Sequence, residues 1–397
     1  MRRFRIGSVF GIPIQLDLTF LLVLPLFAWI IGTQVEQTTG FLNEVLAAGL
    51  DPAMLANGNL VWVLGITAAV GLFSGVVLHE LGHSLVAIRF GYPIDSLTLW
   101  LFGGIAQLTE MPENWKQELA IAIAGPIVSV VLGVLSYVAF ALIPGTQSVV
   151  LEALRFVLAY LALMNVALAV FNMLPGFPMD GGRVLRALLA RRRPYARATK
   201  IAAEVGKLFA VFLGLFGLFV VGNIFLAGLA FFIYIGASGE ARQTSMRAAF
   251  EGVTVQDVMT PADRVTSVTP EMSVRELIQT MFRERHTGYP VEKDGEVVGL
   301  VALEDARAVR DVERDAYTVG DVMTTEILTI EPDRPVMDAL TELQANSVGR
   351  LLVTDEAGEF LGLLTRSDIM TALSIIKSSS EYGALNSSDS QTIRPEP

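Results

Sequence analysis

The sequence predicts a multi-pass α-helical membrane domain with about six spans, followed by a water-soluble α/β domain built from a repeat. Hydrophobic residues make up 52% of the 397 residues and charged residues only 17%, against about 25% charged in an average soluble protein. Long apolar stretches are confined to the first 240 residues. The remainder is polar, and one of its motifs recurs after 64 residues.

Six apolar stretches are candidate spans, and a helix needs roughly 20 apolar residues to cross a bilayer core. The second to fourth stretches are long enough, whereas the first is marginal. The last two are short and meet at Gly222-Asn223, a turn signal that favours a helical hairpin over one long buried helix. The stretches lie at 16–32, 60–88, 118–143, 151–174, 208–221 and 224–238.

Basic residues predict the orientation in the membrane. Arg2, Arg3 and Arg5 precede the first span, and the segment 186–200 carries six basic side chains, whereas the loop 33–59 carries none. Because positively charged loops stay in the cytoplasm, the N-terminus is expected there, and six spans return the soluble domain to the same side. We therefore expect a multi-pass protein of the cell membrane whose N-terminus and soluble domain are cytoplasmic.

The soluble part contains two similar copies. DVMT occurs at 257–260 and again at 321–324, and GEVVGLVALEDA at 295–306 matches GEFLGLLTRSDI at 358–369. Each copy predicts a short strand, a helix, two strands around a glycine turn, and a second helix. A Ser-rich polar end predicts a disordered tail. The predicted limits are 1–240 for the membrane domain, 251–312 and 313–376 for the two copies, and 377–397 for the tail.

Composition also excludes several classes of protein. The chain has no Cys, which excludes disulfides, thiolate metal sites and a cysteine nucleophile. Residues 251–397 hold 13 basic and 27 acidic side chains. Nucleic acid is therefore not an expected partner, because binding to phosphates needs clustered Lys and Arg.

The second span contains the motif HELGH. His79 and His83 are four residues apart, so on a helix they share one face and can bind one metal ion, for which zinc is expected. Glu80 can take a proton from a water molecule at that metal. These three are the only ionisable side chains between Leu60 and Ile88. Since ionisable groups are costly inside a bilayer, a pair of surface histidines is the weaker interpretation.

A third metal ligand is expected from Asp180, within FNMLPGFPMDGGR at the end of the fourth span. The second and fourth spans both run inward, so their C-terminal ends reach the same side of the membrane. Glu110, Glu113 and Glu118 follow the second span and are competing carboxylates. Alone, Asp180 could instead cap the helix that begins at Gly181-Gly182.

These two motifs together resemble the site-2 protease family of intramembrane zinc metalloproteases. GSVFGIPIQLD, FGGIAQL and IAGPIVS also fit, and the resemblance covers residues 1–235. It implies a zinc ion held by His79, His83 and Asp180, with Glu80 as the general base.

The same resemblance assigns a role to Asn172, which matches a family asparagine that positions the substrate or the transition-state oxygen. On its own, Asn172 could merely bond a neighbouring helix. Many members carry an inserted PDZ domain, for which this chain has no room.

The extended sequence at 97–108 suggests how a helical substrate could be handled. A transmembrane helix must unwind before it can be cut, which leaves its backbone groups unpaired in lipid. A protein strand that pairs with the substrate removes that cost. We expect this segment to dip into the membrane beside the zinc, with Gly103-Gly104 as a bend that contacts the substrate. The alternative is a purely structural hairpin in the cytoplasm.

The repeated copies look like a pair of CBS motifs. This resemblance implies an adenine nucleotide (ATP, ADP or AMP) in the cleft between them and a homodimer formed through the pair. Family sites have Ser or Thr followed three residues later by Asp, as in Thr365 and Asp368. The first copy keeps Asp305 but has Ala302 in place of the hydroxyl, so one site is expected. Thr365 could equally cap a helix.

Together these features predict a zinc endopeptidase that cuts transmembrane segments of other proteins near the cytoplasmic side, in regulated intramembrane proteolysis. Nucleotide at the CBS pair would adjust access to the site. The alternative is a CBS-regulated metal or ion transporter in which the histidines and Asp180 bind the cargo. Glu80 separates the two functions, because a transport site needs no base beside its ligand. An inactive scaffold is a third alternative.

Overall fold

The computed structural model describes residues 3–389 except 101–102, 109–113 and 146. It divides into two compact units, Met1–Thr244 and Ser245–Pro397, which we call the membrane unit and the repeat unit. Each is described by itself.

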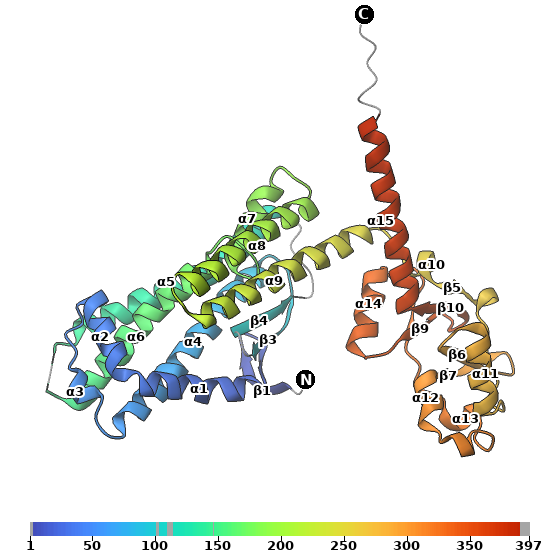
Figure 1. Cartoon of the computed structure of the whole chain (residues 1–397), viewed down its shortest axis with the longest axis horizontal. Coiled ribbons are helices and arrows are strands. Elements are labelled where there is room, and N and C mark those ends of the chain that lie inside the picture. Colours follow the sequence, from blue (N-terminus) through green and yellow to red (C-terminus); the bar gives the residue numbers. More distant parts are fainter. Residues whose placement is uncertain (1–2, 101–102, 109–113, 146, 390–397) are drawn as a thin grey trace, which may run out of the picture. The chain divides into compact units, whose positions relative to one another are not determined.

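The membrane unit is a bundle of helices in which α4, α5 and α6 pack against one another (Figure 1). Within the described residues, five helices are long and apolar enough to cross a membrane: α4, α5, α6, α8 and α9. The helices α1 and α2, bent by 73° at their junction, are the sixth candidate, so the expected count is confirmed. The bounds are α1 Phe20–Thr33, α2 Val35–Leu46, α3 Pro52–Leu55, α4 Leu60–Arg89, α5 Trp115–Leu142, α6 Val149–Asn172, α7 Asp180–Ala190, α8 Tyr195–Phe219 and α9 Ile224–Ala249.

The last two spans are separate helices, as the hairpin interpretation expected. The turn between α8 and α9 contains Gly222 at φ +70°, a conformation that suits glycine. Both helices are longer than the apolar stretches, because polar residues continue them: α8 begins at Tyr195, before its stretch, and α9 ends at Ala249, after its stretch.

A four-stranded sheet lies beside α4, with the order β1-β2-β3-β4. Its strands are β1 Arg3–Val9, β2 Ile12–Asp17, β3 Ile94–Trp100 and β4 Gly103–Leu108. The β2–β3 pair is parallel and the other two pairs are antiparallel. Buried Leu97 and Leu99 pack with Leu81 of α4. The sequence predicted an extended segment only for the second half of this sheet.

The expected bend at Gly103-Gly104 is wrong. Trp100 at the end of β3 pairs with Gly103, so both glycines lie within the paired part of β4. The two glycines are the first residues of β4. The error arose because glycine pairs are common in turns, whereas here a glycine is needed where β4 passes over a side chain of α4.

The repeat unit consists of two halves, and a short segment of each half pairs with a strand of the other half. The order helix, strand, strand, helix is confirmed in both copies. β5 of the first copy pairs with β10 of the second, and Leu300 of β7 in the first copy pairs with Thr324 of the second. The elements are α10 Val255–Val258, β5 Thr260–Pro261, α11 Val274–Glu284, β6 Gly288–Lys293, β7 Glu296–Ala302, α12 Leu303–Ala308, α13 Val319–Val322, β8 Thr329–Ile330, α14 Val336–Ala345, β9 Arg350–Thr354, β10 Phe360–Thr365 and α15 Arg366–Asp389.

Part of the segment 377–397, which was expected to be a disordered tail, belongs to the last helix. α15 continues from Arg366 to Asp389, and residues 390–397 lie outside the described residues. Once a helix is nucleated, each added residue gains one backbone hydrogen bond, so a proline-free polar sequence can extend it.

Candidate metal centre

Three buried side chains from two helices converge on one point of the membrane unit. His79 and His83 share a face of α4, and Asp180 is the first residue of α7. Asp180 Oδ2 lies 3.2 Å from His79 Nε2 and 3.1 Å from His83 Nε2, and the two Nε2 atoms are 3.2 Å apart. The chain thus brings together residues that are about 100 positions apart in the sequence.

This triangle of atoms fits a zinc ion. Zinc is bound by imidazole and carboxylate at about 2.0–2.1 Å, so two ligands at a tetrahedral angle lie about 3.3 Å apart. Two nitrogens and one oxygen are a donor set that zinc accepts, and three ligands leave a fourth position open for catalysis. Among the described residues, these three form the group of His, Asp and Glu whose geometry could hold a metal.

The competing carboxylates are placed elsewhere or lie outside the description. Glu118 bonds Arg186 Nε at 2.6 Å, and Arg186 also bonds Glu240 at 2.5 Å. This network, buried at Arg186 and Glu118 and half-buried at Glu240, joins α5, α7 and α9. Glu110 and Glu113 lie outside the described residues.

Two glycines explain how Asp180 reaches the histidines. A Cβ at Gly181 would lie 2.2 Å from the carbonyl oxygen of Leu174, and a Cβ at Gly182 would lie 2.5 Å from the backbone of Gly176. Only glycine therefore allows the first turn of α7 to fold back onto the loop that precedes it. This close packing places the Asp180 carboxylate beside the two imidazoles, and no side-chain cap bond is formed at the start of α7.

Strand β4 passes directly over Glu80. Glu80 follows His79 on α4 and is half-buried. A Cβ at Gly104 would lie 2.4 Å from Glu80 Cγ, so glycine is required at this crossing. Gly103 precedes it at the start of β4. The residues predicted for catalysis and for substrate contact thus lie side by side.

Asn172 is the last residue of α6 and is half-buried. Its side-chain Nδ2 donates to the carbonyl oxygen of Leu168, at 3.1 Å, within the same helix. Its role towards the substrate stays a prediction.

Helix α5 touches the outer nitrogens of both imidazoles, which the sequence analysis missed. Ser129 Oγ lies 2.9 Å from His79 Nδ1, and the carbonyl oxygen of Ile121 lies 2.7 Å from His83 Nδ1. A serine and a backbone carbonyl have no metal-ligand signature. The IAGPIVS motif, which holds Ser129, is the signal that could have pointed to this face.

In the repeat unit, the predicted nucleotide motif forms a helix cap. Thr365 donates to Asp368 Oδ2 through its backbone N–H at 2.9 Å and its hydroxyl at 2.7 Å. In the first copy, Asp305 accepts from the backbone N–H of Ala302 at 2.7 Å. The capping alternative therefore describes the structure of both copies.

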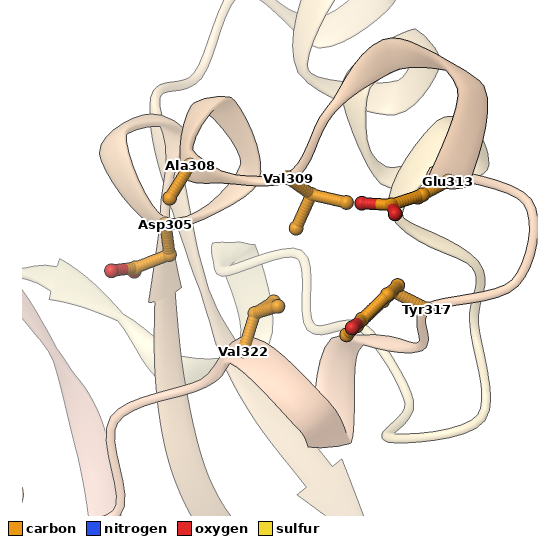
Figure 2. A pocket seen from close by; sticks show the side chains of 6 residues that line it. All are labelled: Asp305, Ala308, Val309, Glu313, Tyr317 and Val322. Atoms are coloured by element: carbon orange, nitrogen blue, oxygen red, sulfur yellow. The ribbon is translucent and has the colours of Figure 1, made fainter.

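Asp305 also lines a pocket of about 310 Å³. Figure 2 shows Val309 and Val322 between Asp305 on one side and Glu313 with Tyr317 on the other. The lining thus combines apolar side chains with the carboxylates of Asp305 and Glu313.

Arg350 of the second copy contacts the first copy, and its charge interacts with Asp305 of this pocket. Arg350 Nη2 donates to Thr287 Oγ1 at 3.3 Å, and the guanidinium lies against Gly288. Burial lowers the pKa of Arg350, and the carboxylates of Asp305 and Glu304 partly offset this effect. Sequence reasoning missed Arg350, because an arginine at the start of a strand has no motif.

Comparisons with known proteins show the family of this chain. The model of peptidase family M50 matches residues 67–156 and 146–213, and the CBS domain model matches 255–310 and 319–375. A zinc metalloprotease of Methanocaldococcus jannaschii is 34% identical over 374 residues, covering 94% of this chain and 96% of that protein. A putative zinc metalloprotease of Mycobacterium tuberculosis is 34% identical over 387 residues, covering 94% and 93%.

Solved structures were compared as well. A site-2 protease from Methanocaldococcus jannaschii is 35% identical, with a TM-score of 0.43, and the match covers 60% of this chain and 95% of that one. CBSX2, a CBS-pair protein of Arabidopsis thaliana solved in complex with AMP, is 32% identical with a TM-score of 0.29, covering 31% of this chain and 98% of that one.

The relatives that match nearly the whole chain are zinc metalloproteases, which favours the protease over the transporter. With its HELGH helix, its convergent aspartate and its two CBS motifs, this chain belongs to peptidase family M50 and is a membrane zinc metalloendopeptidase of the site-2 protease type.

Proposed function

We propose that this enzyme cleaves transmembrane segments of other membrane proteins near the cytoplasmic side, as a step of regulated intramembrane proteolysis. The observation that carries the proposal is the burial of the metal centre among apolar spans. His79 and His83 are 3% and 5% exposed and belong to a 30-residue apolar helix. Substrates able to reach such a centre are themselves held in the membrane.

The chemistry follows from the residues around the centre. A zinc ion held by the three ligands would polarise the scissile carbonyl and acidify the attacking water. Glu80 accepts the proton of that water and delivers it to the leaving amine. Asn172, at the end of α6, is proposed to hold the carbonyl oxygen of the substrate.

Strand β4 is proposed to hold the unwound substrate. Within the described residues β4 is one of the two edge strands of its sheet, so its outer backbone groups can pair with another strand. Pairing offsets the cost of exposing peptide groups to lipid, which is several kcal/mol each. Because Gly104 of β4 crosses over Glu80, a substrate strand added at this edge lies beside the base.

The central test uses full-length protein in proteoliposomes with a transmembrane substrate. Glu80→Gln is expected to lower the cleavage rate by about 10²–10⁴-fold, the usual contribution of a general base, and to leave one zinc ion per chain. Glu44→Gln, at an exposed glutamate of α2, is the matched control. Cleavage by Glu80→Gln at the wild-type rate would contradict the proposal.

The proposed orientation has its own test. Because the chain lacks Cys, single cysteines can be labelled without background. A membrane-impermeant maleimide should label Asn57→Cys in intact cells and should label Glu296→Cys only after lysis, since both positions are exposed. The reverse pattern would invert the orientation and place the repeat unit outside.

We propose further that the repeat unit binds an adenine nucleotide and thereby adjusts substrate access. Val309 and Val322 offer an apolar surface for the base, Asp305 can accept ribose hydroxyls, and Arg350 is a nearby cation for phosphate. Thr365 and Asp368 are the rival location.

Binding of a fluorescent ATP analogue separates the two locations. If the first copy holds the nucleotide, Asp305→Asn and Arg350→Met weaken binding, and Asp368→Asn does not. The opposite result moves the site to the second copy. We also propose that the chain forms a homodimer through its CBS pair. Light scattering with and without ATP tests this, and a single mass equal to one chain under both conditions would exclude the homodimer.

A further inference from the structure

We propose that Ser129 is a positioning residue of the metal centre, which holds the imidazole of His79 so that its Nε2 faces the metal. Ser129 contacts the ring on the side opposite to the ligand atom: its Oγ lies 2.9 Å from Nδ1, whereas Nε2 lies 3.2 Å from Asp180 Oδ2. The proposal rests on the zinc site alone and does not depend on the identity of the substrate.

The partner of His83 shows what such a contact does. The carbonyl oxygen of Ile121 can only accept a hydrogen bond, so His83 must carry its proton on Nδ1. Its Nε2 then has the free electron pair that a metal needs. This contact therefore fixes both the ring orientation and the tautomer of His83.

Ser129 gives His79 the same arrangement by another route. A hydroxyl can accept a hydrogen bond, so Nδ1–H of His79 can donate to Ser129 while Nε2 stays free for the metal. Ser129 is fully buried, with no exposed surface, so water cannot replace the hydroxyl. Without it, a buried N–H would lose its partner, which is unfavourable by about 1–3 kcal/mol.

The rest of this face of α5 is shaped to the same two rings. Ile121, Gly125 and Ser129 follow one another at helical spacing. A Cβ at Gly125 would lie 2.2 Å from His83 Nε2, so only glycine leaves room for that ring. At Gly82 a Cβ would lie 3.1 Å from the carbonyl oxygen of Ala124, which shows how closely α4 and α5 approach. α5 thus orients both histidines without providing a ligand.

The first test measures zinc affinity of full-length protein by competition with a chelator. Partners of metal-bound histidines typically contribute 10–100-fold to metal affinity, so Ser129→Ala is expected to weaken zinc binding by about that factor. The visible spectrum of the Co²⁺-loaded protein should change as well, because the ring is no longer held. Ser129→Thr keeps the hydroxyl and should bind zinc more tightly than Ser129→Ala.

Ser74→Ala is the matched control. Its hydroxyl lies on α4, the same helix as the histidines, but bonds the carbonyl oxygen of Val70 at 2.8 Å. This variant should bind zinc like the wild type. Equal zinc affinity and equal Co²⁺ spectra for Ser129→Ala and the wild type would overturn the proposal.

A second measurement needs no variant and therefore remains decisive if Ser129→Ala fails to fold. The chain has only three histidines, so ¹⁵N-histidine NMR of the zinc-loaded wild type can resolve each ring. The expected spectrum shows His79 protonated and hydrogen-bonded at Nδ1 and bound to metal through Nε2. Metal bound through Nδ1 of His79 would refute the assignment of Ser129.

Discussion

The metal centre of the membrane unit and the capping motifs of the repeat unit use similar side chains in opposite surroundings. In the membrane unit a single carboxylate, Asp180, lies 3.1–3.2 Å from the Nε2 atoms of two imidazoles on another helix. In the repeat unit Asp257, Asp321 and Asp368 each accept hydrogen bonds from a threonine three residues earlier. The first arrangement joins distant segments, and the second is local.

This contrast explains why one motif was informative and the other was ambiguous. An ionisable side chain among apolar spans is costly, so its presence there indicates a specific task. A Thr-x-x-Asp motif in a polar domain caps helices whether or not a ligand binds. The same residue types therefore carry more functional information where polar residues are rare.

The largest effect is expected from a substitution that keeps all three proposed metal ligands but fills the space beside the imidazole of His83. Gly125→Ala puts a Cβ 2.2 Å from His83 Nε2, so we expect loss of bound zinc and cleavage as low as in Glu80→Gln. Gly228→Ala on α9, where a Cβ meets nothing within 4 Å, should keep both. Zinc content by mass spectrometry and cleavage assays check this. Full zinc occupancy in Gly125→Ala would contradict this prediction, because it would mean that the site can admit the added methyl group.

A second prediction compares two arginine–carboxylate pairs of similar length. Arg186 bonds Glu118 at 2.6 Å with side chains 2% and 4% exposed, whereas Arg275 bonds Asp315 at 2.5 Å with side chains 43% and 69% exposed. Arg186→Met leaves Glu118 buried without its cation, so we expect a loss of about 3–5 kcal/mol of stability.

Arg275→Met serves as the exposed counterpart, and no measurable change in stability is expected from it. Thermal unfolding of the full chain in detergent measures the first variant by tryptophan fluorescence, because all four tryptophans belong to the membrane unit. Hydrogen exchange of segment 311–317 measures the second. An unchanged unfolding temperature in Arg186→Met, or faster hydrogen exchange of segment 311–317 in Arg275→Met, would mean that burial does not separate these pairs.

The membrane fold could be predicted from the sequence where one segment determines its own structure. Apolar length alone indicated the spans, and helical spacing placed His79 beside His83. The sheet was harder to predict. β2 and β3 pair in parallel although about 80 residues separate them. The N-terminal strands also adjoin an apolar stretch. No local pattern encodes such a pairing, so β1 and β2 were missed.

The remaining misses share a physical cause. Ser129 and the carbonyl of Ile121 act through their position on α5, and neither residue type predicts a metal site. Arg350 contacts the other copy of the repeat, so its surroundings depend on how the two copies pack. Contacts between segments distant in sequence are set by tertiary packing, which a motif cannot report.

The smallest expected effect is the response of the repeat unit to acid. Hydrogen bonds from the backbone and hydroxyl of Thr254 lower the pKa of Asp257 from its ordinary 3.8, and Thr318 lowers that of Asp321 in the same way. A carboxylate with a lowered pKa in the folded state stabilises the fold above the ordinary value, and this contribution is lost as the pH falls through the lowered one. Hydrogen exchange at the Thr254 and Thr318 amides should therefore gain protection as the pH rises from about 2 to 5. At each pH, Asp257→Asn and Asp321→Asn, compared with the wild type, should remove this dependence at their own cap only. If protection in the wild type does not change over this range, the ionised form of the carboxylate does not hold these caps.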